Sequence, residues 1–437
     1  MTSWRRHATA LATRAMPPRG TAALAALLLA AALLAAATVA RGADLWADAD
    51  GGRWLRLVTT LKSTGLVARA PADSVLYPER CSAASLWRLR LDLDARPASW
   101  LAVEAAYLQR LQTLSAGACA ALGEGILPAA GAAPYRVDPL EGALVEAEGL
   151  AWRHELDRAA ARLQRGRLEA ILGRQAVGWG RGVLFGAVDV FSPFSPLEHD
   201  REWRRGVDAA RLRLAGPVSL DAVAVLGENG DRSAFLVRAY GYHGSLDGEL
   251  VVGKRREDVM AGLVLSGVAG DAELHFDAAW FGLDDPWRST AGGDSDAVIK
   301  ATLGGSWSAD LHGPLLLVGE LHYCGFGVRD VAALDAAGDD LAERLLHGDL
   351  QVLGRRAAAL QASWGFDLAA RLGAAWLLSL QDGSGVVTLS ADWTVSDELS
   401  LSARGYLAHG ARPADGAVRS EHGGTPASLL VQMSFTF

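Results

Sequence analysis

The feature that most constrains this chain is an alternation of apolar and polar residues with a period of two, repeated to its end. The stretch 86–94 reads L-W-R-L-R-L-D-L-D, so Leu89, Leu91 and Leu93 share one face and the charges share the other. The same alternation fills 271–281 and 427–437. A helix repeats every ~3.6 residues and cannot sort residues in this way, whereas a strand does. The alternation therefore predicts an all-β chain.

Eighteen segments show this pattern, and most are near the ~10 residues that a tilted strand needs to cross a bilayer. They span 53–61, 86–94, 99–110, 146–156, 167–175, 207–215, 217–226, 233–243, 246–253, 258–267, 271–281, 297–307, 314–325, 356–366, 368–380, 385–394, 398–408 and 427–437.

The connections between these segments have a regular rhythm. After even-numbered segments most are short, although 157–166 is somewhat longer. After odd-numbered segments most are long: 62–85, 111–145, 176–206, 282–296, 326–355 and 409–426. Short turns at one rim and long loops at the other are typical of an outer-membrane barrel with both termini in the periplasm. A soluble β-sandwich or solenoid explains the period but not the rhythm. We therefore expect a single transmembrane antiparallel β-barrel of about 18 strands, with a range of 14 to 18.

The N-terminus indicates export. Four arginines precede the uncharged, Ala- and Leu-rich run 21–37, and small residues follow at 38–40. This predicts a signal peptide over 1–40, cleaved on export to the Gram-negative outer membrane, with a membrane anchor as the alternative. A short periplasmic segment over 41–52 and a barrel over 53–437 would follow. Without 1–40 the chain has 38 basic and 50 acidic residues, a net charge of −12, which is unfavourable for nucleic-acid binding.

Two segments resemble known proteins. The first is a motif that reads Gly173-Arg174-Gln175-x3-Trp179-Gly180-x8-Asp189-x-Phe191-x-Pro193. It is similar to a motif of porin-like barrels of Gram-negative bacteria, loosely akin to alginate-export channels. The last segment, which ends at Phe437, resembles the terminal strand that the outer-membrane barrel assembly machinery recognises. The resemblance implies a channel that contacts outer-membrane lipid, the assembly machinery and small hydrophilic solutes, and it identifies no solute.

Charged and polar residues on the inward face of the predicted strands are expected to line the lumen. They are Arg88, Arg90, Asp92, Glu104, Arg211, Arg213, Arg238, Glu273, His275, Asp277, Lys300, Glu320, His322, Arg371 and Arg404. Rings of one sign set ion preference in channels, and this set is mixed, so no preference follows. Opposite charges on neighbouring strands would also pair and fill the lumen.

The sequence gives weaker evidence for metal binding or catalysis. The carboxylates and histidines near 273–277 and 320–322 are of types that bind metals or shuttle protons. Their predicted strands are next-but-one neighbours, about 10 Å apart, which is wide for a shared metal, so a polar lumen ladder is favoured. There is no G-x-S-x-G motif and no convergent Ser, His and acid trio. We expect no enzyme activity, cofactor or metal.

The connection 176–206 is unusually apolar for a loop, and exposed to water it would form a costly patch. We expect it to fold against the barrel wall or into the lumen, as a constriction or as a brace, with Arg174 and Asp189 as an ion pair. Cys81 and Cys119 lie in the first two long loops and are a candidate disulfide. Residues 332–347 have the leucine spacing of a short helix. Six residues near strand ends are candidates for aromatic girdles: Trp280, Trp307, Tyr323, Trp364, Trp376 and Trp393.

These observations favour a channel for passive diffusion of small hydrophilic solutes. An exit duct for a periplasmic polymer or product, and a plugged barrel with a structural or adhesive role, stay open as alternatives.

Overall fold

The computed structural model describes residues 43–115, 125–128, 134–138, 140–289, 293–330, 341 and 343–437. Within these residues the chain forms one sheet of twenty antiparallel strands. The strands are β1 Ala43–Ala47, β2 Trp54–Arg69, β3 Cys81–Ala98, β4 Leu101–Leu114, β5 Glu141–Ala147, β6 Leu150–Arg165, β7 Leu168–Gln175, β8 Val207–Leu214, β9 Val218–Val225, β10 Ala234–His243, β11 Leu246–Arg255, β12 Asp258–Ala269, β13 Ala272–Ser289, β14 Gly293–Asp310, β15 Pro314–Cys324, β16 Arg356–Gly365, β17 Ala370–Ser379, β18 Gly385–Thr394, β19 Leu399–His409 and β20 Ala427–Thr436.

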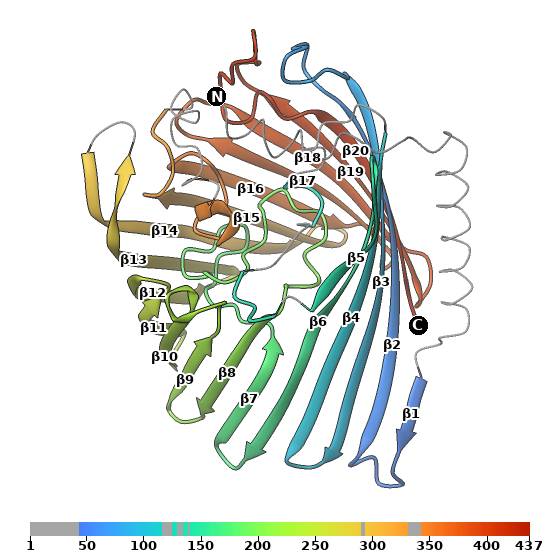
Figure 1. The fold of residues 1–437 in the computed structure, drawn as a ribbon, viewed down its shortest axis with the longest axis vertical. Helices are drawn as coiled ribbons and strands as arrows, with labels where there is room; N and C mark the ends of the chain where they lie inside the picture. Colours follow the sequence, from blue (N-terminus) through green and yellow to red (C-terminus); the bar gives the residue numbers. More distant parts are fainter. Residues whose placement is uncertain are drawn as a thin grey trace.

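Eighteen of the described strands, all except β1 and β5, form a closed barrel (Figure 1). The ring closes where β2 pairs with β20, from Thr60 opposite Thr436 to Arg69 opposite Ala427. At the end of this seam the backbone of Phe437 donates to the Thr59 carbonyl at 2.9 Å and accepts from the Thr59 N–H at 3.0 Å. Closure pairs every wall strand with two neighbours, which a sheet in lipid requires.

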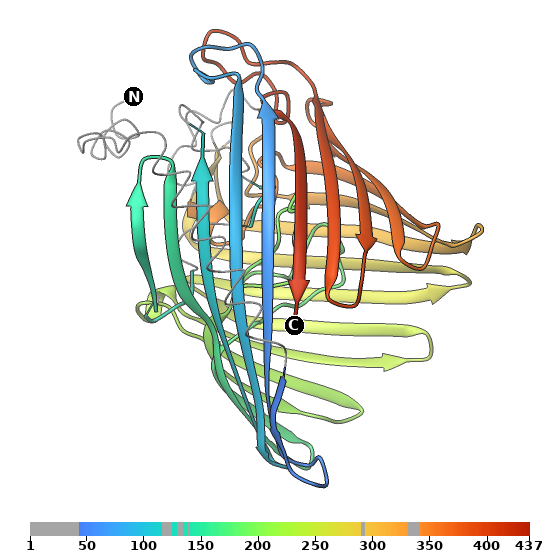
Figure 2. The same cartoon turned by 90° about the vertical axis from the view of Figure 1, so that its right-hand side faces the viewer.

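The two remaining strands, which the sequence did not predict, cover edges that the wall strands leave open. β1 pairs with 54–57 of β2, next to the stretch of the same edge that pairs with β20 (Figure 2). β5 pairs with 150–155 of β6, whose edge farther along pairs with β7. Part of the expected N-terminal segment 41–52 is therefore a strand.

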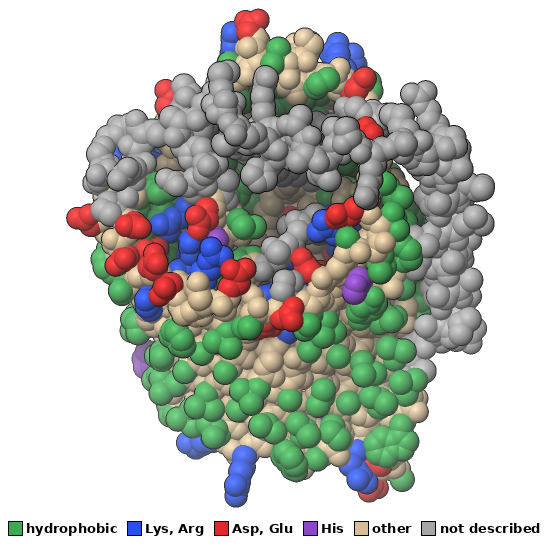
Figure 3. Space-filling view, viewed as in Figure 1, with side chains coloured by type: hydrophobic (Ala, Val, Ile, Leu, Met, Phe, Trp, Pro, Cys, Tyr) green, Lys and Arg blue, Asp and Glu red, His purple; other side chains and the backbone are tan. Residues whose placement is uncertain are grey.

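The outward face of the wall is apolar, and a band of hydrophobic side chains covers the lower wall in Figure 3. Leu274 and Leu360 are each 57% exposed, whereas their inward neighbours His275 and Ala359 are each 4% exposed. This sorting fits a barrel with lipid outside and a packed polar interior.

The six candidate girdle residues are all on the exposed, outward face, between 37% and 54% exposed. They lie at two levels. Trp307 pairs with Ala272 at the short-turn rim, and Trp280 lies eight residues farther along β13, about 27 Å at the usual rise per strand residue. Trp364 and Trp393 lie near short turns, and Tyr323 and Trp376 lie near the loop ends of their strands. Two such levels are typical of the two membrane interfaces.

The predicted strands match the observed wall with three main differences. The expected loop 62–85 is shorter, because β2 continues to Arg69 and β3 begins at Cys81. Over 62–69 the inward Leu66 and Ala68 pack in an apolar cluster with loop residues, while Ser63 and Gly65 face outward, so the alternation is lost. The second difference is at 157–166, where β6 continues to Arg165 and only a tight turn follows. The third is at the expected long loop 282–296, where β13 continues to Ser289 and β14 begins at Gly293, with a register shift between Gly282 and Trp287.

Three other features of the chain bear on the expectations. Residues 1–42 and Cys119 lie outside the described residues, so the signal peptide and the disulfide stay predictions; Cys81 is exposed at the start of β3. Residues 341 and 343–346 are helical, at the end of the expected loop helix. Among the described residues no helix is long and apolar enough to span a membrane.

Candidate functional site: an internal segment and the cavity beside it

The segment 176–206, between β7 and β8, runs through the interior of the barrel, where Figures 1 and 2 both place it. Its apolar side chains are buried: Val177, Phe185, Ala187 and Val188 are each 0% exposed. We call 176–206 the inner segment. The expectation that it folds back against the wall or into the lumen agrees with its position.

The first arm of the inner segment is held by side chains of the wall and of one further loop. Six consecutive backbone N–H groups, from 181 to 186, each donate a hydrogen bond to a side-chain oxygen. Asp277 accepts from 181 and 182 at 2.9 and 3.1 Å. Glu320 accepts from 183, 184 and 185, the last two at 2.9 Å. Gln351 accepts from Gly186 at 2.8 Å. Runs of N–H groups turned the same way form concave sites for anionic groups, and two carboxylates occupy this one.

Glu320 also accepts from His275 Nε2 at 3.0 Å, although β14 lies between their strands. The intervening residue is Gly304; a Cβ there would lie 2.6 Å from both His275 Nε2 and the Glu320 Cγ. The expected 10 Å gap between the strands is thus bridged, because the middle strand has no side chain at this point. Beside it the ring of Phe185 stacks on His322 with centroids 4.6 Å apart.

The second arm, 197–206, lies against β2, β3 and β19. Asp200 receives hydrogen bonds from Lys62 Nζ, at 2.7 Å, and from Arg88. The ring of Trp203 lies beneath Lys62 Nζ at 4.1 Å and beside Arg90 at 5.0 Å, both to the ring centroid. Cation–π contacts of buried ammonium and guanidinium groups stabilise such an arrangement. The second arm is therefore held by cations, whereas carboxylates hold the first.

Titratable groups of this arm are shifted by their surroundings. Burial raises the pKa of Glu198 to about 7. Burial, together with the charge of Arg404, lowers the pKa of His199 to about 4. Burial alone would raise the pKa of Asp200, but the charges of Arg88 and Lys62 hold it well below its usual range. At neutral pH, Asp200 is thus charged and His199 neutral.

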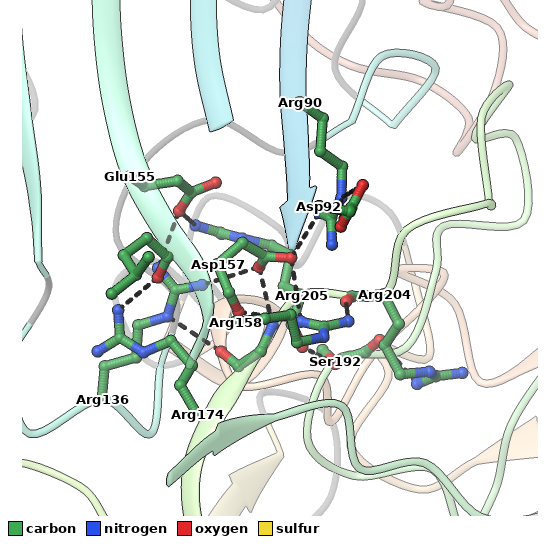
Figure 4. A network of polar contacts seen from close by, with 12 residues as sticks. Arg90, Asp92, Arg136, Glu155, Asp157, Arg158, Arg174, Ser192, Arg204 and Arg205 are labelled. Carbon is green, nitrogen blue, oxygen red and sulfur yellow. Dashed lines mark hydrogen bonds and ion pairs between the residues drawn. The ribbon is translucent and has the colours of Figure 1, made fainter. Parts of the chain in front are cut away.

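Asp157 is the centre of a polar network where the inner segment returns to the wall (Figure 4). Its carboxylate accepts from Arg90 at 2.8 Å, from Arg136 at 3.2 Å, from Arg158 at 3.0 Å and from the Gly206 backbone N–H at 3.0 Å. The pairing of β6 with β4 shifts here, so Asp157 is an extra residue and both it and Arg158 reach this network. This bulge also explains why the alternation ended at 156.

The expected ion pair between Arg174 and Asp189 is wrong. Arg174 pairs with Asp208, through Nε to Oδ1 at 2.7 Å, and its guanidinium also donates to the carbonyls of Leu156 and Asp138. The chain leaves the wall at the end of β7, and these contacts of Arg174 connect that end to the neighbouring strands β6 and β8. Asp189 pairs instead with Arg204, fifteen residues along the inner segment.

Residues 349–351, in the connection between β15 and β16, also pack against the inner segment, which the sequence did not predict. Gln351 donates to the Phe194 carbonyl at 2.8 Å, in addition to accepting from the first arm. Asp349 forms a fully buried ion pair with Arg255 of β11, and Arg255 Nε donates to the Val190 carbonyl at 3.2 Å. The inner segment is thus held by this loop as well as by the wall.

A cavity of about 470 Å³ lies between the inner segment and the wall. Five arginines line it: Arg201 and Arg204 from the inner segment, and Arg211, Arg213 and Arg238 from β8 and β10. Trp179 also lines it, and its ring lies 5.5 Å from the Arg238 guanidinium. Asp189 is the one acidic residue among the described residues that line the cavity.

Most of the residues expected in the lumen, including some that line the cavity, form hydrogen bonds with neighbours along the wall. Arg211 bonds Asp221 at 2.8 Å, Arg238 bonds Glu249 at 3.1 Å, and Arg90 bonds Asp92 at 2.8 Å. Glu104 is half-buried near Arg158, and Arg404 donates to His199 at 2.5 Å. Glu273 and Arg371 are exposed toward the short-turn rim. Lys300 is fully buried, and no hydrogen-bond acceptor for its Nζ is found among the described residues.

Several important residues were not singled out from the sequence: Asp157, Asp200, Arg136, Arg201, Arg204 and Gln351. All except Asp157 lie in loops, where no periodicity signals which way a side chain points, and Asp157 lies at the bulge. Among the described residues, no three His, Cys, Asp or Glu side chains are placed to share a metal ion.

The fold resembles solved outer-membrane proteins. A BenF-like porin from Pseudomonas fluorescens Pf-5 superposes with a TM-score of 0.52 at 11% identity, covering 88% of this chain and 98% of that one. OccAB4 from Acinetobacter baumannii gives 0.52 at 10% identity, with the same coverage. OccK11 (OpdR) from Pseudomonas aeruginosa gives 0.51 at 12% identity, covering 88% and 96%. No protein-family model and no curated protein matches the sequence.

Proposed function

We propose that the chain is a porin-like outer-membrane channel through which small hydrophilic solutes diffuse passively. The observation that carries this proposal is the closed barrel with an internal segment that leaves an arginine-lined cavity of about 470 Å³ beside it. A segment fixed inside a barrel narrows the route without closing it, so the inner segment acts as the constriction. Export with a cleaved signal peptide and insertion by the barrel assembly machinery belong to this proposal.

The cavity supports a preference for solutes that carry negative charge or several hydrogen-bond acceptors. Five guanidinium groups face one carboxylate there, and a guanidinium offers planar pairs of N–H donors. Arg201 is the least neutralised of these groups among the described residues, because its guanidinium donates to backbone carbonyls, those of Val183, Ser195 and Pro196, and forms no ion pair with a described residue. The remaining expected lumen residues would line the route on either side.

Planar-bilayer recording of the purified chain tests the proposal. We expect discrete conductance steps, and in a salt gradient a reversal potential displaced toward the anion. Arg201→Ala should reduce that displacement, whereas Arg371→Ala, which removes an equal charge far from the cavity, should change it less. An inserted, heat-modifiable barrel that never conducts would contradict the channel and favour the plugged structural barrel.

A further inference from the structure

An apolar groove of about 650 Å³ crosses the outward face of β13 to β18. Its floor is formed by Gly305 and Gly319, which lie directly opposite each other on β14 and β15. Leu274 and Leu360, the next residues across the sheet on either side, are large and exposed. Two facing glycines between two leucines leave a depression in a surface that otherwise presents large side chains to lipid.

A cluster of three arginines lies at the loop end of the same strands. Gln381 holds two chain segments together there: its Nε2 donates to the Arg329 carbonyl at 2.9 Å, and its Oε1 accepts from the backbone N–H of Arg355 and, at 3.2 Å, of Arg356. Burial, followed by the positive charge of Arg329, lowers the pKa of Arg355. Asp330 follows Arg329 in the chain, and the Glu421 carboxylate accepts from the N–H groups of Leu353 and Gly354 beside the cluster, whereas the side chains of Arg329 and Arg356 are exposed.

The cluster and the groove are aligned along β16. Arg356 and Leu360 share the outward face, four residues or about 13 Å apart, and the residue between them on this face is the small Ala358. Arg356 is exposed and lies opposite Tyr323, one of the aromatic residues at the loop-side level. Arg356 thus lies at the loop-side membrane interface, and the apolar groove begins next to it on the face that contacts the hydrocarbon layer.

We propose that this surface binds one phosphorylated glycolipid of the outer leaflet, with a headgroup phosphate on Arg329 and Arg356 and an acyl chain in the Gly305–Gly319 groove. The inference rests on the proposed function, because that function places the loop rim at the outer leaflet. A phosphate matches two exposed guanidinium groups, and an acyl chain matches the apolar lining. A second copy of the chain fits less well, because its own Arg329 and Arg356 would approach these residues in a two-fold contact.

The test uses the full-length protein extracted from the outer membrane in mild detergent, with bound lipid identified and counted by native mass spectrometry. One variant reverses the charges, Arg329→Glu with Arg356→Glu. A second fills the groove, Gly319→Leu, at a site where an added Cβ would meet only the Leu360 side chain, at 3.3 Å. Gly305 is unsuitable, because a Cβ there would lie 2.7 Å from the Glu273 carbonyl. The matched control, Arg69→Glu with Lys254→Glu, makes the same charge change at exposed positions of β2 and β11.

We expect the wild type and the control to retain the glycolipid, and both test variants to retain at least about tenfold less. The first variant replaces two cations that attract an anionic headgroup with two anions, and the second fills the groove that would hold the acyl chain. Equal loss in the control, retention in both variants, or a phosphoglycerolipid in place of the glycolipid would overturn the inference. Heat-modifiability and conductance are measured for each variant as well, so that failure of the lipid site can be distinguished from failure of the proposed channel function. A conducting barrel without bound glycolipid refutes the lipid site alone.

Discussion

Removal of the Glu320 carboxylate should loosen the first arm of the inner segment and widen the channel. Glu320 accepts three backbone N–H groups, at 183, 184 and 185, and the ring of His275. Hydrogen bonds to a charged group contribute ~1.5–3 kcal/mol each, so loss of the three backbone bonds in Glu320→Ala should destabilise the bound position of this arm by about 4.5–9 kcal/mol. The lower end of this range corresponds to a shift of roughly two-thousandfold toward a released arm.

Two measurements check this prediction. Single-channel conductance should rise in Glu320→Ala, and hydrogen exchange of the amides 181–186 should accelerate. Glu273→Ala is the matched control: it removes the same charge from β13, and no hydrogen bond from Glu273 to the inner segment is found among the described residues. A Glu320→Ala barrel that keeps its heat-modifiability, its conductance and its amide protection would refute the idea that this carboxylate holds the constriction.

Three further outcomes are expected. Leu274→Arg, on the exposed outward face two residues from the Ala272–Trp307 pair at the short-turn rim, should destabilise the barrel by about 1–2 kcal/mol in a urea titration, whereas the neighbouring Glu273→Arg should cost clearly less; equal losses would mean that the facing is wrong. Deletion of Ser434–Phe437 removes residues that pair with β2 at the closing seam, and should abolish the heat-modifiable form in the outer membrane. Because burial raises the pKa of Glu198 to about 7, above its usual 4.5, the folded arm binds this proton more tightly and stability should fall as the pH rises from 4.5 to about 7. Above pH 7 the new negative charge should weaken anion preference in bilayer recordings, and Glu198→Gln should remove that pH dependence.

The wall could be predicted because a lipid outside and a polar interior impose opposite demands on successive residues. Leu274 faces lipid and His275 faces the interior, so the alternation there is clear and the strand could be predicted. It fails where a bulge inserts Asp157, since one extra residue reverses the facing of all that follow. It also fails at 62–69, where the inward side packs on loop residues and is itself apolar.

The site could be predicted only in part, because alternation indicates the face of a residue but not its partner. Asp277 and Glu320 were expected on the inward face, and the structure places both against the inner segment. Their partners are backbone N–H groups, which every residue possesses and which no residue type signals. Strand spacing predicts a separation of about 10 Å here, wide for a shared metal, and the hydrogen bond between His275 and Glu320 spans it because Gly304 has no side chain.

The pairing of the lumen charges explains why a mixed composition does not by itself indicate ion preference. The acids Asp277, Glu320 and Asp200 hold the inner segment, the first two through backbone N–H groups and the third through Lys62 and Arg88. A carboxylate that accepts from backbone N–H groups is satisfied without consuming a cation of the lumen. Five guanidinium groups line the cavity with one carboxylate, although the mature chain carries more acids than bases. Four of the five are in ion pairs: Arg204 with Asp189, Arg211 with Asp221, Arg213 with Glu169 and Arg238 with Glu249. The bonds of Arg201 found among the described residues go to backbone carbonyls alone. We therefore expect the sign of such a constriction to depend on which charges stay unpaired beside the internal segment, and not on the sum of the charges that line the strands.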